Sequence, residues 1–105
     1  MKASLQPKQK STQSLPSMEL KWTLGALANL DNIATYIAQD NPSRATTFVR
    51  ELKEKIEGLK QFQAGHTGRI FGTKELVLHK NYLVIYRVKS RQVQILRIQH
   101  VAQDR

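Results

Sequence analysis

The feature that most constrains the fold is a change of hydrophobic period along the chain. Between residues 23 and 62, apolar side chains recur every three or four positions, which is the spacing of one helix face. After the segment "QAGHTG", residues 63–68, apolar and polar side chains alternate, as in half-buried strands. Helices followed by strands are typical of an α+β domain.

Two helices are predicted in the first part of the chain. Thr23 can cap a helix that runs to about Gln39, and Asn41 and Pro42 can begin a second that runs to about Phe62. The apolar positions of the first are Leu27, Leu30, Ala34 and Ile37, with Leu24 and Ile33 beside them. Those of the second are Ala45, Phe48, Val49, Leu52, Ile56, Leu59 and Phe62. The short connection between the helices predicts an antiparallel hairpin.

Four strands are predicted around these helices. Residues 19–22 form a short first strand, and residues 75–79, 82–88 and 93–100 form the others, with "KSRQ" as a hairpin turn. In the strand 82–88, Tyr82, Val84, Tyr86 and Val88 share one face, and Leu83, Ile85 and Arg87 share the other. We therefore expect the helical hairpin to pack on one face of a twisted antiparallel sheet.

The second face of such a sheet stays in contact with water. We expect Arg87 and Arg97 on or beside this face, with Arg69, Lys74 and Lys80 around its rim.

Composition bounds the class of protein. With 105 residues the chain forms one domain, and 40% hydrophobic with 24% charged residues is ordinary for a globular protein. The absence of cysteine excludes disulfides, thiol nucleophiles and thiolate metal sites, and it fits the reducing cytoplasm. No apolar run is long enough to cross a bilayer, so no membrane role is expected.

The formal net charge of +9 is concentrated in the strand half. Residues 19–57 carry five basic and six acidic side chains, whereas residues 60–105 carry nine basic and two acidic ones, a net charge of +7. Such a field favours nucleic acid, an acidic protein partner or anionic lipid.

The opening residues 1–17, "MKASLQPKQKSTQSLPS", are rich in Ser, Gln, Lys and Pro. Such a segment buries too little apolar surface to offset the entropy of ordering, so we expect a disordered basic tail before a domain at 18–105. It lacks the apolar centre of a signal peptide. Met18 is an alternative natural start, and a basic arm that touches a partner is the functional alternative.

The residues that carry catalytic chemistry are few. Three histidines, His66, His79 and His100, lie far apart without metal-ligand spacing, so no metal site is expected. No glycine-rich loop opens a helix, and Glu75 is nearly alone as a carboxylate in the strand half, which argues against paired-carboxylate hydrolysis. We expect no cofactor and no small-molecule substrate.

Several basic and aromatic residues have two interpretations each. His100 is the best candidate for proton transfer, or a structural histidine at a strand end. Arg87 and Arg97 can hold phosphates in bidentate fashion, pair with acidic residues of a partner, or solvate a sheet face. Tyr82 and Tyr86 can stack on bases or pack in the core.

Five segments in order resemble the RelE/ParE family of toxins from bacterial type II toxin–antitoxin modules. They are Trp22-Thr23, "YIAQDNP" at 36–42, "GRIFGTKELV" at 68–77, "YLVIYRV" at 82–88 and "ILRIQHVAQDR" at 95–105. The resemblance spans residues 18–105. It implies a helical hairpin packed against a twisted antiparallel sheet, in agreement with the periodicity.

The resemblance implies one of two activities. RelE-like toxins cut messenger RNA in the ribosomal A site, and ParE-like toxins poison DNA gyrase. This chain has Glu75, Val77 and Leu83 where RelE-like enzymes carry basic catalytic groups, and only His100 lies near a matching position. An acid and two aliphatic side chains cannot stabilise the charge that develops on a phosphate. "GTKELV" and "YIAQDNP" also resemble the ParE branch.

The resemblance therefore implies a gyrase inhibitor that blocks replication and growth, stabilises plasmids, and is not itself an enzyme. The alternatives are a ribosome-dependent messenger RNA endoribonuclease that uses His100, Arg87 and Arg97, and a non-toxic basic nucleic-acid-binding domain. The implied partner is an antitoxin with an acidic segment. The expected contact residues for antitoxin or target are Arg69, Lys74, Tyr82, Arg87, Arg97 and His100.

Overall fold

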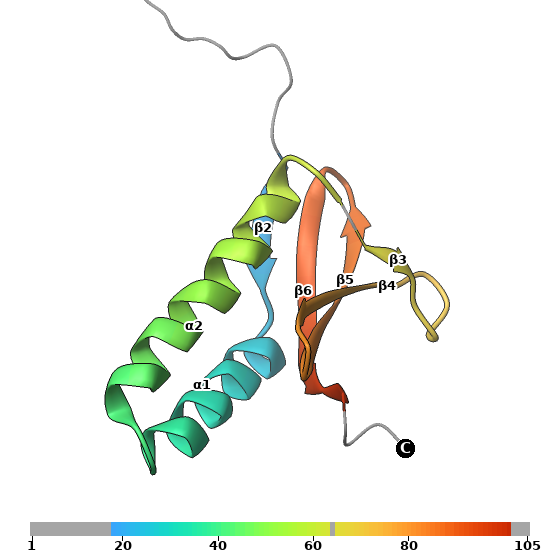
Figure 1. The fold of residues 1–105 in the computed structure, drawn as a ribbon. Coiled ribbons are helices and arrows are strands. Elements are labelled where there is room, and N and C mark those ends of the chain that lie inside the picture. Colours follow the sequence, from blue (N-terminus) through green and yellow to red (C-terminus); the bar gives the residue numbers. More distant parts are fainter. Residues whose placement is uncertain (1–17, 64, 102–105) are drawn as a thin grey trace, which may run out of the picture.

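A computed structural model describes residues 18–63 and 65–101 of the chain (Figure 1). Helices α1 (Leu24–Ala38) and α2 (Pro42–Glu57) form a hairpin, and a short 3-10 turn η2 (Gly58–Lys60) follows. The strands are β2 (Glu19–Trp22), β3 (His66–Thr67), β4 (Lys74–His79), β5 (Tyr82–Lys89) and β6 (Gln92–His100). Within the described residues they form one five-stranded sheet in the order β2-β6-β5-β4-β3. The predicted tail at 1–17 lies outside the described residues.

One side chain fixes the start of α1 and its place on the sheet. Thr23 Oγ1 accepts a hydrogen bond from the Ala26 amide at 3.2 Å, which caps the helix as predicted. The same hydroxyl donates to the Ile95 carbonyl of β6 at 2.8 Å. Because Thr23 directly follows β2, this one residue connects β2, α1 and β6.

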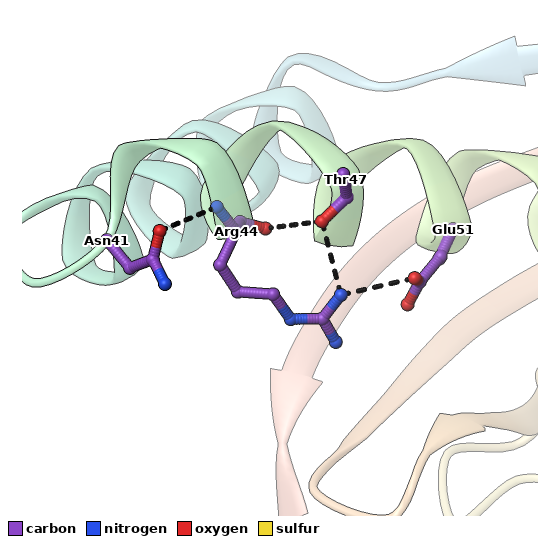
Figure 2. A network of polar contacts seen from close by, with 4 residues as sticks. All are labelled: Asn41, Arg44, Thr47 and Glu51. Carbon is purple, nitrogen blue, oxygen red and sulfur yellow. Dashed lines mark hydrogen bonds and ion pairs between the residues drawn. The ribbon is translucent and has the colours of Figure 1, made fainter.

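The first turns of α2 are held by a polar network on its exposed side (Figure 2). Asn41 Oδ1 accepts from the Arg44 amide at 3.0 Å, so Asn41 is the N-cap that the sequence predicted. The Arg44 guanidinium donates to Thr47 Oγ1 at 3.2 Å and pairs with Glu51 Oε2 at 3.1 Å. An exposed ion pair of this kind contributes only about 0–1 kcal/mol. The network therefore fixes the positions of these exposed side chains and adds little to the free energy of unfolding.

The helical hairpin covers one face of the sheet and forms the core there. The most deeply buried members, none more than 1% exposed, are Ala26, Leu52, Ile56, Leu59, Leu78, Val84, Tyr86, Val93 and Ile95. On α2 the predicted stripe is confirmed from Ala45 to Ile56, and Leu59 continues it in η2.

On α1 the predicted stripe is partly wrong. The helix buries Ala26, Leu30 and Ile33, whereas Leu24 and Leu27 are 85% and 44% exposed. The small side chain of Ala26 allows the helix to approach β6 closely, so the contact face is centred on Ala26 instead of Leu27. Periodicity alone allows either face, because both carry apolar residues at helical spacing.

The predicted end of the second helix at Phe62 is also wrong. The α-helix ends at Glu57, and Phe62 is 73% exposed. Glycine is unfavourable in a helix interior, and Gly58 stands where the α-helix gives way to the 3-10 turn. The turn still delivers Leu59 to the core.

The sheet is mixed, because its first strand runs parallel to its last. Strands β4, β5 and β6 pair antiparallel, as predicted. Strand β2 pairs with β6 in parallel, from Glu19 opposite Gln92 to Trp22 opposite Ile95. A parallel pair needs a crossover connection, and the helical hairpin begins that crossover here. The two-residue strand β3, which lies inside the "QAGHTG" break, was not predicted.

A register shift in β6 decides which side chains face the helices. Ile95 lies opposite Tyr86 and Arg97 lies opposite Ile85, which leaves Leu96 as an extra residue on β6. Ile95 and Ile98 can therefore both face the helices although they are three residues apart. Strict alternation would have placed Arg97 on the same face as Ile95.

The connection between β5 and β6 is the predicted two-residue turn. Its residues Ser90 and Arg91 have φ angles of 53° and 60°, in the left-handed region that favours glycine. Two such residues match the mirror-image turn that suits the twist of a hairpin. The turn is therefore recognisable by position but not by its residue types.

Replacing Leu52 with Ala should lower the free energy of unfolding by about 2–5 kcal/mol, because Leu52 is 1% exposed and its loss leaves a cavity between α2 and the sheet. The matched control is Leu24→Ala, which removes the same atoms from an 85% exposed position. Urea unfolding of both variants measures the difference. Equal effects would contradict the core assignment.

Candidate functional site

The sheet face that the helices leave uncovered, called the outer face below, is partly apolar. It comprises Glu75 and Val77 of β4, Leu83, Ile85 and Arg87 of β5, and Arg97 and Gln99 of β6. Leu83 and Ile85 are each only 7% exposed although no helix covers them. The loop between β3 and β4 folds beside this face, and Ile85 lines the hollow between that loop and the sheet.

A hollow of about 350 Å³ lies between this loop and the sheet. Its lining is Ile70, Phe71, Gly72, Thr73, Ile85, Arg87, Leu96 and Arg97. The Arg87 Nε donates to the Gln94 side-chain oxygen at 2.6 Å. The hollow therefore combines aliphatic walls with two guanidinium groups, which suits a partner that carries both apolar and acidic groups.

A buried acid supports one side of the outer face. Glu75 is 8% exposed, and its Oε2 accepts from the Arg69 backbone amide at 3.3 Å and from Arg69 Nε at 3.4 Å. Burying a carboxylate is costly unless it is paired and hydrogen-bonded. Arg69 therefore neutralises Glu75 and fixes the base of the loop.

A second hollow, called the α1 cleft below, lies between α1 and the last residues of β6, with a volume of about 510 Å³. Asn29, Asn32, Ile33 and Tyr36 of α1, Tyr82 of β5, and Arg97, Ile98, Gln99 and His100 of β6 line it. The Asn29 side-chain oxygen accepts from the Ile98 amide at 3.0 Å, which ties the helix to the strand edge.

Tyr82 and His100 pack against each other in the α1 cleft. Their ring centroids are 4.9 Å apart in an edge-on arrangement, and Phe48 contacts Tyr82 from the other side at 5.6 Å. Burial raises the pKa of Tyr82, and the nearby Tyr36 raises that pKa further. The packing interpretation of Tyr82 is thus the one that the structure favours.

The six contact residues expected from the sequence do not form one site. Arg87 and Arg97 lie on the outer face. Arg69 pairs with Glu75, which belongs to the same face. Tyr82 and His100 lie on the face that the helices cover. Lys74 stands opposite Tyr86 and shares its face of the sheet, away from Arg87. Arg97 lines both hollows.

Where β4 pairs with β5, the strands carry no cationic side chain on the outer face. Val77 lies opposite Leu83, and Glu75 lies opposite Ile85. Val77 is 56% exposed, so this part of the sheet presents an aliphatic surface to water. Among residues 18–63 and 65–101, no cluster of three or more metal-ligating side chains is present, and no helix is long and apolar enough to cross a membrane.

Sequence reasoning missed two groups of exposed residues. Ile70 and Phe71 form the tip of the β3–β4 loop, and the signal for this turn was the glycine at position 72 before a strand. Asn32 and Tyr36 of α1 line the α1 cleft, and Tyr36 was marked only by being an aromatic residue that is 70% exposed on its helix.

Comparison with known proteins identifies the family. The model of the ParE toxin of type II toxin–antitoxin systems, parDE, matches residues 20–105. This chain belongs to the ParE toxin family. The protein Y4kP of Sinorhizobium fredii, whose name marks it as a toxin candidate, is 41% identical over 87 residues, covering 81% of this chain and 90% of that protein. Toxin RelE2 of Caulobacter vibrioides is 32% identical over 84 residues, covering 80% and 96%.

Solved structures of toxin–antitoxin systems share the fold of this ParE-family toxin. The chromosomal ParDE system of Pseudomonas aeruginosa contains a chain that is 34% identical, with a TM-score of 0.75, covering 81% of this chain and 97% of that one. A chain of the RelBE2 complex of Mycobacterium tuberculosis is 22% identical with a TM-score of 0.56, covering 80% and 98%. The second likeness shows the fold alone.

The raised pKa of Tyr82 predicts a loss of stability at high pH. As the pH rises, Tyr82 ionises in the unfolded chain before it ionises in the folded chain. The contribution of Tyr82 to the free energy of unfolding is therefore complete below the ordinary pKa of 10.0, and it is lost as the pH rises through the pKa of the folded state. Urea unfolding between about pH 9 and pH 11 should show a smaller decline for Tyr82→Phe than for wild type. Identical declines would show that Tyr82 is not shielded from water.

Proposed function

We propose that this toxin inhibits DNA gyrase by binding it, without chemistry of its own, and that an antitoxin neutralises it. The observation that carries the proposal is the composition of the outer face, where Glu75, Val77 and Leu83 lie together. The family resemblance matches these three residues to the basic catalytic groups of RelE-like enzymes. Gyrase acts on the chromosome, so the proposed site of action is the cytoplasm.

The electrostatics at the three matched positions argue against cleavage of RNA. Phosphate cleavage needs donors or cations placed where negative charge develops. Val77 and Leu83 offer neither, and Glu75 adds negative charge that Arg69 only balances. A surface of this composition is suited to binding an apolar and acidic protein segment.

A ribonuclease activity is the second candidate function, because the α1 cleft brings basic and aromatic side chains together. Arg97, His100 and Tyr82 line the same α1 cleft, and an arginine beside a histidine can hold and protonate a phosphate group. The relationship to toxin RelE2 is compatible with it. The α1 cleft is on the helical side, however, where Arg87 does not contribute.

An antitoxin partner follows from the family and from charge. The similar structures from P. aeruginosa and M. tuberculosis are those of toxin–antitoxin systems. Residues 60–105 carry a net charge of +7, which destabilises an isolated domain through self-repulsion. An acidic antitoxin segment that contacts Arg69, Arg87 and Arg97 would relieve this repulsion and stabilise the folded toxin by mass action.

Induced expression of the toxin alone should stop DNA synthesis before protein synthesis, and the purified toxin should inhibit supercoiling by purified gyrase. The reason is that gyrase inhibition blocks replication forks while ribosomes remain intact. Labelled thymidine and labelled amino acids, followed separately after induction, measure the two rates.

The opposite order of events would contradict gyrase as the target. If protein synthesis stops first, and His100→Ala abolishes the arrest while His66→Ala does not, the ribonuclease interpretation is correct. General acid–base assistance contributes on the order of 10²–10⁴-fold, so the loss would be large. His66 is the matched control because it is exposed and lines neither hollow.

Replacing both Arg87 and Arg97 with Ala should weaken antitoxin binding about tenfold or more, because each would lose a charge-assisted contact. The matched control is Arg50→Ala together with Lys53→Ala, which removes two cations from exposed positions of α2. Titration calorimetry with the purified antitoxin measures both affinities. An unchanged affinity in the double variant would remove the outer face as the antitoxin contact.

A further inference from the structure

The tip of the loop between β3 and β4 carries two exposed apolar side chains. Ile70 is 65% exposed and Phe71 is 102% exposed, so neither contributes much to the core. Single exposed apolar residues are common on protein surfaces. These two are adjacent and lie beside a hollow that Arg87 and Arg97 also line. Ile70 and Phe71 are called the loop tip below.

Hydrogen bonds within the loop hold the tip in one conformation. Gly68 N donates to the Thr73 carbonyl at 2.9 Å, and Thr73 donates to the Ile70 carbonyl through its amide at 3.1 Å and its hydroxyl at 2.6 Å. Gly72 has a φ of 84°, as required at the third position of a type II turn, so Phe71 occupies the corner before it. A preformed loop loses little conformational freedom when it binds.

The shape of the tip indicates the kind of partner. An extended segment that wraps around a protein seeks a groove, whereas a convex apolar tip needs a concave apolar pocket. A pocket of that kind belongs to a folded protein. Large apolar anchors that fill such pockets dominate the energy of many interfaces.

The charges beside the tip indicate the rim of that pocket. Among the described residues, Arg87 and Arg97 have no carboxylate partner, and the hydrogen bond of the Arg87 Nε goes to the Gln94 amide. Polar rims surround apolar interface centres, and acidic side chains there would pair with both arginines.

We propose that the loop tip inserts into an apolar pocket with an acidic rim on the folded protein that this toxin poisons, while Arg87 and Arg97 pair with the rim. The proposal rests on the proposed function, in which the toxin acts by binding a target protein. A nucleic acid fits less well, because Phe71 is the one aromatic residue that lines the hollow and its neighbours Ile70 and Ile85 are aliphatic, whereas single-strand binding stacks successive bases on several aromatic side chains.

In this proposal the two arginines are shared with the antitoxin, whereas the tip contacts the target alone. If the antitoxin covers Arg87 and Arg97, it excludes the target by direct overlap. The tip then distinguishes the two partners in an experiment, because its loss affects the target alone.

The test compares Phe71→Ser with Phe62→Ser, a matched control that is 73% exposed and lies outside the hollow. Three quantities are measured for the full chain: growth arrest after induction, the concentration for half-inhibition of purified gyrase, and affinity for the purified antitoxin. Phe71→Ser should relieve the arrest and raise the half-inhibiting concentration about tenfold or more. It should leave antitoxin affinity unchanged, and Phe62→Ser should resemble wild type in all three measurements.

Ile70→Ser is a second variant of the tip, and circular dichroism checks the fold of each. If Phe71→Ser arrests growth as wild type does, or loses antitoxin affinity, the proposal is overturned. The proposal is also overturned if both tip variants fail to fold, or if the wild-type toxin does not arrest growth. A third contrary outcome is that the wild-type toxin binds a single-stranded oligonucleotide and Phe71→Ser loses this binding. If wild type arrests growth without inhibiting gyrase and Phe71→Ser does not arrest, the tip proposal stands and gyrase is excluded as its target.

Discussion

Two helices can cover only one face of this sheet, and the organisation of the molecule depends on that constraint. The core forms where α2 places Phe48, Leu52 and Ile56 against the strands. The outer face has no second helical layer, and the loop between β3 and β4 lies beside Ile85 there instead. A sheet covered on one side only leaves the remaining surface available for partners.

Under the proposed function, the composition of that open surface is what separates binding from catalysis on a shared fold. Related domains with the same architecture host different activities, so function depends on the side chains at particular positions. Here the buried acid Glu75 is matched by Arg69 from the loop, whereas Arg87 and Arg97 have no acid of their own among the described residues. The surplus positive charge is therefore directed outward, beside aliphatic side chains.

The helices and the three antiparallel strands could be predicted because their signals are local. Thr23, Asn41 and Pro42 mark helix starts by residue type, and the alternation along β5 gives both of its faces. The family motifs pointed to the same architecture and to the toxin family.

Other features depend on single residues or on distant contacts. The extra residue Leu96 sends Arg97 outward, and no periodicity argument reveals an insertion of one residue. The parallel pairing of β2 with β6 joins the two ends of the fold, which local signals do not encode. Helix α1 carries apolar residues on two neighbouring faces, so periodicity alone does not say which of them packs on the sheet. Close packing against the sheet places the face with Ala26 there. Lys74 and His100 lie away from Arg87 because strand pairing, which joins distant residues, assigns each its face. The position of Tyr82 on the face opposite to that of Arg87 followed from the alternation along β5 itself.

The position of β6 has a consequence for the synthesis of the toxin. β6 is the last strand among the described residues and lies inside the sheet, between β2 and β5. Strand β6 pairs with β2, with Glu19 opposite Gln92, and most of the domain's sequence lies between these two strands. While β6 is still within the ribosome, β2 and β5 have no common neighbour, and only local units such as the helical hairpin and the β4–β5 pair can form. The surface that carries Arg87 and Arg97 is therefore incomplete on the growing chain until β6 has emerged and paired with β5.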